Sequence, residues 1–526
     1  MGLLNWLKRF FTQGTERTEE IEETKEIKGT GGSDPAPSRN GRSGEQSSSR
    51  DAIAPKEAKE PAAEPLSPER KRPPIRPVRP DEDERVKVWV GLDYGTSFTK
   101  VAYRVLGGSR KVIPLRMNPG ASFPYGLPSL LAFDGETILF GDEAEYFLSR
   151  SPWYQGVRCV KILFAGDVAD EYKDESLSAR FQEYCEGQII DASLLKPGYL
   201  VAAYLVWIMN RTRQVLLQEL GANLLVNFNV CLPIDTYEKK KVRSEFQRAI
   251  NVAEHLEHLW DGKSDSGMLK TIAALWGKTS DEEPSNSKVH LVPEAVAQMA
   301  SYTNSLGAEK KIHGVIDFGA GTIDFSIFNL RDESEEGKCV YWYNAVTFPG
   351  GMEGVEEIVA KHRSKSDGNI SFGELRKAIE NISAESPVVL EEVKELLESV
   401  WEKARFPVWG KAYAKMKKES EWKKEKVKVF VCGGGSKLPF VRDIFGRSWY
   451  RDDWGPYEVA DLYAPSDFSG SPSDFSRLAV AYGLTTPRPE LMEYVLPKDC
   501  KDQTPPTRYV TTERDGVWGP VYFDNH

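Results

Sequence analysis

The stretch that decides the fold is residues 88–100, which read VWVGLDYGTSFTK. An apolar segment ends in an acid, Asp93, and is followed by a glycine, two hydroxyls and a second apolar segment. Gly95 lets the backbone approach a ligand without a Cβ in the way. Thr96 and Ser97 offer hydroxyl and amide donors, and Asp93 is placed to bind Mg²⁺ through water. The order predicts a hairpin that holds a phosphate; an ordinary hairpin turn is the alternative.

The same plan recurs at residues 314–327, GVIDFGAGTIDFSI. Again an apolar segment ends in an acid, Asp317, followed by glycines, the hydroxyl of Thr322 and another apolar segment. Two copies of one phosphate hairpin, far apart in the chain, predict two related halves that close on one nucleotide.

A third glycine turn lies at residues 429–439, VFVCGGGSKLP. An apolar strand pattern runs into the glycines, and an amphipathic segment begins just after them. A flat base or sugar could lie against the bare backbone of Gly433 and Gly434.

These three segments resemble the first phosphate, second phosphate and adenosine motifs of the actin/Hsp70/sugar-kinase ATPase superfamily, and the Hsp70 branch is the nearest match. Their order and spacing agree over roughly residues 86–485. The resemblance implies an α/β, two-lobed actin/Hsp70-like ATPase fold with ATP or ADP and Mg²⁺ in the cleft between the lobes. Lobe I would span 86–310, with an insertion at about 255–289 that ordinary Hsp70s lack, and lobe II would span 311–485.

From residue 85 onward, strand and helix patterns alternate, as expected for an α/β fold. Strands are predicted at 86–93, 98–105, 129–133 and 225–232 in the first half, and at 314–318, 322–330, 339–348 and 427–432 in the second. Helices are predicted at 197–220, 236–257, 352–363, 373–381 and 387–418.

Composition limits the classes of function. The chain has 526 residues, is 40% hydrophobic and carries a formal net charge of −10, so it can bury a sizeable core and does not favour nucleic-acid binding. Its six cysteines lack zinc-site spacing, which fits reduced thiols in the cytoplasm. No apolar stretch approaches the roughly 18–20 residues needed to span a bilayer.

Both ends differ from the body of the chain. Residues 1–11 carry apolar side chains at helical spacing and lack the features of a signal peptide, which predicts an amphipathic helix. Residues 12–85 are rich in Pro, Ser and charge, which predicts a disordered linker. The helix would dock on a partner protein, on an anionic membrane surface as a peripheral contact, or on the chain's own domain. We predict that residues 486–526 are a short extension and not a peptide-binding domain.

The resemblance assigns catalytic roles to Lys161, Glu294, Asp317 and Thr322. Lys161 would contact the γ-phosphate and help orient the attacking water, although an exposed amphipathic lysine is the plainer alternative. Glu294 would lie near the metal and the water; the alternative is a first-turn acid stabilised by the helix dipole. Asp317 would share the Mg²⁺ shell with Asp93, and Thr322 would help place the water.

The resemblance also assigns nucleotide contacts to Gly95, Thr96, Ser97, Phe98, Gly319, Ala320, Gly321, Gly350, Gly351, Glu402, Arg405, Gly433, Gly434, Lys437 and Asp474. Ala320 stands where Hsp70s usually have glycine. Glu402 and Arg405 match the pair that clamps adenosine, with a surface ion pair as the alternative. Lys437 matches an arginine that stacks on adenine, and lysine stacks less well.

The function expected from these residues is an Hsp70-like, chaperone-related switch that binds and hydrolyses Mg-ATP without a substrate-binding domain. It would act through protein partners bound by the N-terminal helix or the 255–289 insertion. The alternatives are an actin-like protein that polymerises with ATP, a small-molecule kinase, and a nucleotide sensor that scarcely hydrolyses. The fold by itself does not separate them.

Overall fold

The computed structural model describes residues 85–221, 223–260, 262–333, 337–367 and 370–501, which belong to one compact unit beginning at Arg85. The helix predicted at 1–11 and, apart from Arg85, the linker predicted at 12–85 lie outside the described residues. The extension predicted at 486–526 is described as far as residue 501.

The first sheet has the strand order β3-β2-β1-β7-β8. β1 is antiparallel to β2, and β2 is antiparallel to β3 and to the short β4, whereas β7 and β8 continue the sheet parallel to β1. β1 is buried along most of its length, as expected for a central strand with both faces covered. The strands are β1 (Val86–Tyr94), β2 (Phe98–Val105), β3 (Val112–Pro114), β4 (Gly126–Pro128), β7 (Leu224–Leu232) and β8 (Val289–Pro293).

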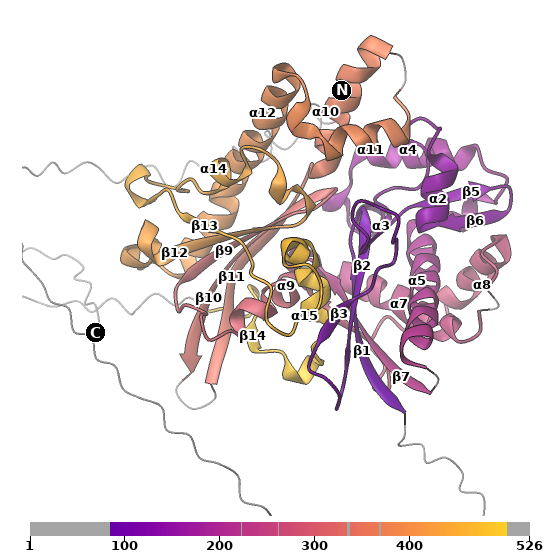
Figure 1. Ribbon diagram of the computed structural model, residues 1–526, viewed down its shortest axis with the longest axis horizontal. Helices are drawn as coiled ribbons and strands as arrows, with labels where there is room; N and C mark the ends of the chain where they lie inside the picture. The colour runs from indigo at the N-terminus through magenta and orange to yellow at the C-terminus, as the bar shows by residue number, and fades with distance from the viewer. Residues whose placement is uncertain (1–84, 222, 261, 334–336, 368–369, 502–526) are drawn as a thin grey trace, which may run out of the picture. The chain divides into compact units, whose positions relative to one another are not determined.

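The second sheet repeats this plan with the order β13-β12-β9-β10-β11-β14 (Figure 1). β9, β10 and β11 are successively antiparallel, and β12 and β13 follow parallel to β9. The addition is β14, which lies parallel to β11 at the opposite edge. The strands are β9 (Ile312–Phe318), β10 (Thr322–Glu333), β11 (Gly337–Pro349), β12 (Val427–Cys432), β13 (Glu458–Ala460) and β14 (Glu493–Val495). The chain is therefore an α/β protein with two mixed sheets of like topology.

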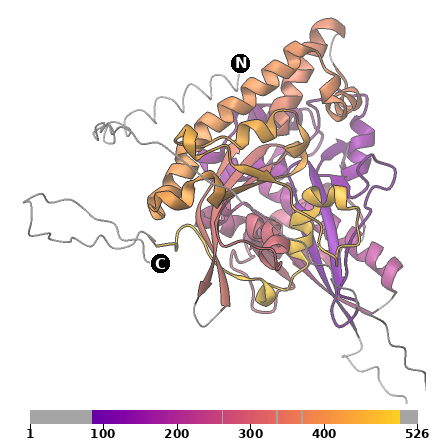
Figure 2. The same cartoon turned by 60° about the vertical axis from the view of Figure 1, so that its left-hand side comes forward.

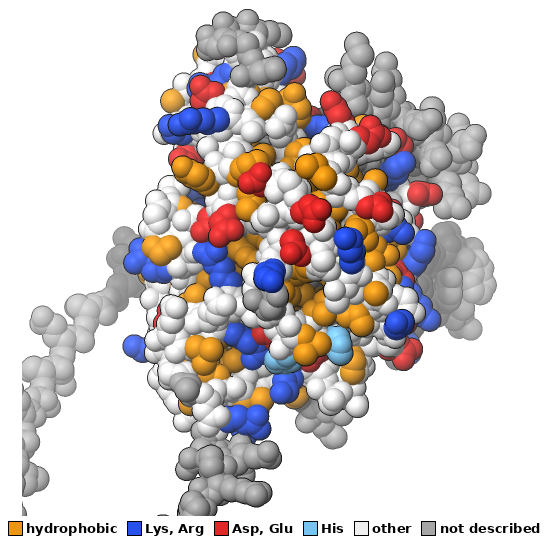
Figure 3. Space-filling model, turned by 90° about the vertical axis from the view of Figure 1, so that its right-hand side faces the viewer, with side chains coloured by type: hydrophobic (Ala, Val, Ile, Leu, Met, Phe, Trp, Pro, Cys, Tyr) orange, Lys and Arg blue, Asp and Glu red, His pale blue; other side chains and the backbone are white. Residues whose placement is uncertain are grey.

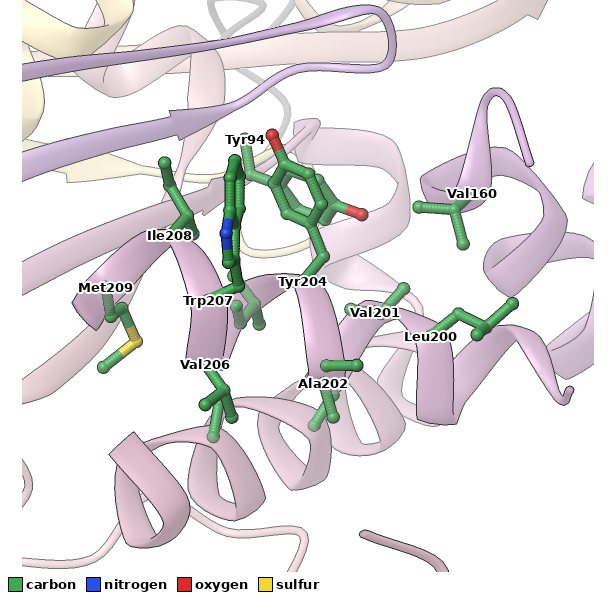
Figure 4. Packing of buried hydrophobic residues seen from close by; sticks show 14 of the residues in the cluster. Tyr94, Val160, Leu200, Val201, Ala202, Tyr204, Val206, Trp207, Ile208 and Met209 are labelled. Carbon is green, nitrogen blue, oxygen red and sulfur yellow. The ribbon is translucent and has the colours of Figure 1, made fainter. Parts of the chain in front are cut away.

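The long helix α5 (Pro197–Leu220) supports the first hairpin. Tyr94, at the end of β1, stacks on Tyr204 with ring centroids 5.0 Å apart, and Trp207 lies beside them (Figure 4). The Tyr204 hydroxyl donates to Thr99 Oγ1 at 3.0 Å and to the Pro128 carbonyl at 3.1 Å. This fully buried cluster fixes the hairpin that carries the first predicted phosphate turn.

Two helices lie between the sheets, α9 (Glu294–Thr303) and α15 (Phe475–Leu484) (Figures 1 and 2). Their backbones approach closely, because a Cβ on Gly483 would lie 1.8 Å from the Ala297 carbonyl oxygen. A Cβ on Gly91 in β1 would lie 2.1 Å from the Ala481 carbonyl oxygen. Glycine is therefore required at both positions to seat α15 against α9 and against the first sheet.

Further helices flank each sheet. The first half of the chain adds the hairpin of β5 (Leu131–Asp134) and β6 (Thr137–Phe140), with α2 (Gly141–Leu148), α3 (Val160–Val168), α4 (Glu175–Glu186), α7 (Lys240–Glu257) and α8 (Ser266–Trp276). The second half adds α10 (Met352–Asp367), α11 (Phe372–Glu380), α12 (Pro387–Ala404) and α14 (Val441–Phe445).

Two predicted helices are interrupted. The helix predicted at 236–257 is divided into α6 (Ile234–Glu238) and α7, because Lys239 is extended with φ −75° and ψ 100°. The helix predicted at 387–418 consists of α12, a π-helical segment (Arg405–Gly410) and α13 (Lys411–Lys415). Pro407 lacks the N–H that a continuous α-helix would use, so the ladder widens at this segment. The helix predicted at 197–220 has the predicted bounds.

No helix in the described ranges is both long enough and apolar enough to cross a membrane.

Candidate functional site

The two predicted phosphate turns lie against each other. A Cβ on Gly321, in the second turn, would lie 3.0 Å from Thr96 Cγ2 in the first turn. The same Cβ would lie 2.2 Å from Ile162 Cδ1 in α3. Only glycine allows this approach without displacing a neighbour, so the two sheets present their matching hairpins at one place.

Two lysines and two carboxylates lie close to the point where the two turns meet, on the side of the first sheet. Asp93 and Lys100 are paired across β1 and β2, and their side chains form an ion pair at 3.0 Å. Lys161 in α3 reaches Glu294, the first residue of α9, at 3.1 Å. Asp93 and Lys161 are nearly fully buried, at 2% and 9% exposure. Lys161 is therefore buried, and the alternative of an exposed amphipathic lysine is wrong.

The second-sheet side carries acids on neighbouring strands. Asp317 on β9 faces Asp324 on β10, which in turn faces Thr347 on β11. Asp324 accepts hydrogen bonds from Thr322 Oγ1 at 3.2 Å and from Thr347 Oγ1 at 2.5 Å. Asp317 accepts one from Gln298 Nε2 on α9. A pocket at this point is lined by Asp317, Asp324, Gln298 and Thr347 together with Asp235, Glu294 and Ser326.

Burial and mutual repulsion set the charges of these groups. Burial, followed by the charge of Glu294, raises the pKa of Asp317 to about 7 and that of Asp324 to about 8. Burial also raises the pKa of Asp93, against the opposing effect of Lys100. For Lys161, burial is the largest single effect and would lower the pKa. The charge of Glu294, its hydrogen bond and the weaker effects of other nearby groups together exceed the effect of burial and raise the pKa. Several carboxylates that lie close together and raise one another's pKa values would be stabilised by a bound cation.

The turn at residues 349–351 closes on the second hairpin. The Gly350 amide donates to the Gly321 carbonyl at 3.1 Å, and the Glu353 amide donates to the Ala320 carbonyl at 2.6 Å. A Cβ on Gly351 would lie 2.5 Å from the Gly319 carbonyl oxygen. The loop that contains Ala320 is therefore held by backbone hydrogen bonds.

The third glycine turn packs on the end of β9. Gly433 has φ +80°, and a Cβ there would lie 2.3 Å from Asp317 Oδ1, which joins this turn to the acidic site. Gly434 is exposed with open space around its Cα, and Lys437 is exposed. Asp474 is half-buried at the start of α15, where the Ser476 carbonyl accepts a hydrogen bond from the Gly433 amide at 3.4 Å.

The predicted adenosine clamp is an ion pair at the end of α12. Arg405 Nε lies 3.1 Å from Glu402 Oε2, with the two side chains 34% and 56% exposed. The Arg405 guanidinium also lies over the ring of Phe406, 4.8 Å from its centroid. The hydrogen bonds and ion pairs of the described residues do not join this pair to Lys437 or to the third turn.

A second set of contacts joins the two halves of the chain beside the hairpins. Arg180 in α4 binds Glu353 at 3.2 Å and Glu357 at 3.3 Å, both in α10, and Arg158 pairs with Glu356 of the same helix. Backbone bonds add to them, from the Phe372 amide to the Ser151 carbonyl at 3.0 Å and from the Gly373 amide to the Ser149 carbonyl at 3.2 Å. We call these contacts the inter-half latch.

The insertion predicted at about 255–289 contains α8. This helix packs on the hydrophobic core of the first half of the chain through Met268, Leu269 and Ile272. Trp276 lies edge-on to Tyr199 of α5, with centroids 5.3 Å apart. Figure 3 shows the face that includes α8, where acidic side chains gather across the upper half among apolar and basic ones. Helix α8 therefore contributes to the hydrophobic core of the first half of the chain.

Sequence comparison does not assign this chain to a protein family. Neither a protein-family model nor a curated protein sequence matches it. The functional argument therefore depends on the chain's own residues and their arrangement.

Several residues of the site were missed at the level of sequence. Lys100 and Asp324 each lie seven residues after the aspartate they face, so the hairpin register was a usable signal. Gln298 follows Glu294 by one helical turn, which places both on one face of α9. The sequence holds no such signal for Cys231 and Thr347. They reach the site only because their strands pair with other strands of the sheets.

Proposed function

We propose that this chain is a Mg²⁺-dependent ATPase of the actin/Hsp70-like fold, nearest to the Hsp70 branch, that works as a two-state switch. The observation that carries the proposal is the meeting of two like hairpins, one from each of two like sheets, with Lys161 and Glu294 beside them. Glycine turns that present backbone amides suit phosphate groups, and paired acids suit a divalent cation.

The residues fit the metal that this fold implies. Asp93 and Asp317 are carboxylates on the first strands of their sheets, with raised pKa values that a bound cation would bring down. Oxygen donors of this kind suit Mg²⁺, which would be held here through water. When bound, the ion neutralises charge on the phosphates.

The chain's own groups would divide the remaining tasks. Lys161 holds a positive charge that Glu294 maintains, and it would stabilise the transferring phosphoryl group. Glu294 lies at the start of α9 with a second carboxylate oxygen to orient a water molecule. Thr322, held by Asp324, would assist in placing that water. The turns at Gly95–Ser97 and Gly319–Gly321 would supply the amides.

The output of the switch would be the relative position of the two halves. The inter-half latch and the α9–α15 pair connect them in the described residues, so closing and opening around nucleotide would act on these contacts. We infer that partner proteins read this change, through the N-terminal segment or the surface around α8.

A nucleotide sensor with little hydrolysis is the second candidate. One observation favours it: Lys161 and Glu294 are already paired with each other at 3.1 Å, which leaves fewer of their donors and acceptors for phosphate and water.

The test is to measure ATP binding and phosphate release for the wild type, Lys161→Ala and Asp317→Ala, with light scattering recorded in parallel. Lys173→Ala is the control, because this exposed lysine forms only a surface pair with Glu175 at 3.9 Å. We expect both site variants to lose phosphate release at least about a hundredfold, with the control unchanged.

The outcomes separate the candidates. Tight ATP binding without phosphate release in the wild type would favour the sensor. Scattering that rises with ATP would favour the polymerising protein. Turnover that is equal in all four proteins would disprove the site.

A further inference from the structure

We propose that Asp93, Cys231 and Glu294 form a site for a thiophilic divalent cation of the zinc class, distinct in its ligand chemistry from the Mg²⁺ of the proposed ATPase. One carboxylate oxygen of each acid and the Cys231 sulfur all lie within 4.8 Å of one another. The three residues come from adjacent elements of the first sheet: Asp93 from β1, Cys231 from β7, and Glu294 directly after β8. Parallel strands end at the same edge, so the sheet itself gathers the donors.

The cysteine makes this set more than an acidic cluster. Cys231 is fully buried, and its sulfur has no hydrogen-bond partner among the described residues. A buried thiol that has no partner and lies within 4.8 Å of an oxygen of each of two carboxylates requires an explanation. The alternative is that Cys231 only fills space, as a small apolar residue of the core would. That role does not account for the position of the thiol near two carboxylates.

The ligand types select the metal. Mg²⁺ takes hard oxygen ligands in an octahedral arrangement, whereas Zn²⁺ accepts sulfur and oxygen together in a tetrahedral one. Tetrahedral bonds of the usual lengths place sulfur and oxygen ligands roughly 3.6 Å apart, so the donor atoms need to close by only about an ångström. Three protein ligands leave a fourth position for water or a phosphate oxygen.

The charges permit such an ion. Lys100 at 3.0 Å from Asp93 and Lys161 at 3.1 Å from Glu294 balance the two carboxylates in the cation-free chain. Binding of the metal requires the Cys231 thiol to lose its proton, because the thiolate is the ligand. On binding, the S–H bond breaks, the sulfur electron pair forms the metal–sulfur bond, and the proton leaves to solvent.

The second sheet supplies a matched control. Cys432 is the last residue of β12, opposite Asp317 of β9, and Cys231 is the residue before the last in β7, which lies beside β1; both cysteines are fully buried. It is absent from the set of donors that gather within 4.8 Å.

The experiment titrates the nucleotide-free full chain, kept reduced, with Cd²⁺ and Co²⁺ as spectroscopic probes and with Zn²⁺ by calorimetry. We expect one equivalent of metal and a thiolate-to-metal charge-transfer band in the wild type and in Cys432→Ser. Cys231→Ser should lose the band and bind more weakly, by more than the roughly 10–100-fold that the loss of an outer-shell partner costs. Glu294→Gln should keep the band, because Cys231 is still present, and should bind the metal more weakly. This second variant tests the site even if Cys231→Ser does not fold.

An unchanged band or affinity in Cys231→Ser, or a band lost equally in Cys432→Ser, would overturn the proposal. The metal site does not rest on the proposed ATPase. A final arm adds Mg-ATP to the cadmium-loaded chain, where ATP that displaces the band supports both proposals. A band that forms without any effect of ATP supports the metal site and counts against the ATPase.

Discussion

At the scale of single residues, the site depends on buried carboxylates whose charge is held by specific partners. Asp324 is the clearest case, because two threonine hydroxyls donate to it, that of Thr322 from the same strand and that of Thr347 from the neighbouring strand β11. Hydrogen bonds to the ionised form favour that form, so Thr347 lowers the pKa of Asp324 against the larger effect of burial, which raises it to about 8.

Replacing Thr347 by Val should therefore raise the pKa of Asp324 further. Asp324 faces Asp317, one of the two acids proposed to hold Mg²⁺, so its negative charge would add to the attraction of the ion. Part of the Mg²⁺ affinity should therefore be lost as pH falls through the pKa of Asp324 and its charge disappears. In Thr347→Val that loss should begin about one pH unit higher than in the wild type. Calorimetric titration with Mg²⁺ from pH 6 to pH 9 measures the shift.

Ser326→Ala is the matched control, since Ser326 on β10 lines the same pocket, and among the described residues no hydrogen bond joins it to Asp324. Identical pH profiles for Thr347→Val and the wild type would show that Asp324 does not control cation binding.

At the scale of elements, the positions of α9 and α15 between the sheets are decided by glycines. Gly483 and Gly91 bring helix backbone against helix and strand, at distances where a methyl group would collide with a carbonyl oxygen. A backbone atom cannot rotate away as a side chain can, so the whole helix would have to move.

Gly483→Ala should accordingly destabilise the fold by more than about 2 kcal/mol, measured by urea unfolding. Gly277→Ala is the control, because Gly277 has φ −73° and its added Cβ would meet no atom within 4 Å. A Gly483→Ala protein as stable as the control would mean that α15 is not seated against α9 as described.

The central strand of the second sheet gives a prediction on pH. His313 in β9 is fully buried, stacks on Phe328 with centroids 4.6 Å apart, and shares a hydrogen bond with the Tyr302 hydroxyl at 2.8 Å. Burial, followed by the charge of Lys311, lowers the pKa of His313 to about 3. The unfolded chain, with a pKa of about 6.5, takes up the proton first. This contribution to stability is complete above pH 6.5 and is lost as pH falls toward 3.

Between pH 6.5 and pH 4.5, the wild type should lose about 2–3 kcal/mol more stability than His313→Gln. Urea unfolding of both proteins at several pH values measures the difference. Parallel pH profiles would show that His313 is already protonated in the folded chain.

At the scale of the whole compact unit, the two halves are joined on both sides of the hairpins. Helices α9 and α15 form one junction, and the inter-half latch forms the other. The ion pairs of the latch are partly or largely buried, and they lie outside the two apolar cores.

Arg180→Ala removes the bonds to Glu353 and Glu357 and the contact with Trp153, 5.4 Å from its ring centroid. On the proposed function, nucleotide release should become about tenfold faster, which corresponds to ~1.4 kcal/mol. Stopped-flow displacement of a fluorescent ATP analogue measures the rate. Arg442→Ala, which breaks an exposed pair with Asp461 at 2.8 Å, should leave the rate unchanged. Equal rates in all three proteins would mean that the latch does not limit release.

The sequence went furthest where local patterns decide the structure. The helix at 197–220 and the hairpin strands were predictable because apolar periodicity and glycine turns act over a few residues. The break at Lys239 and the π-helical segment were missed, because they depend on backbone geometry that periodicity does not register.

The candidate site divides in the same way. The acids Asp93 and Asp317 with their glycine turns are local signals that the sequence determined by itself. That Lys161 binds Glu294, that Cys231 faces two carboxylates, and that Thr96 touches the turn of Gly321 were decided only by the tertiary structure. Each of these contacts joins residues more than sixty positions apart, and only the pairing of distant strands and helices brings such residues together.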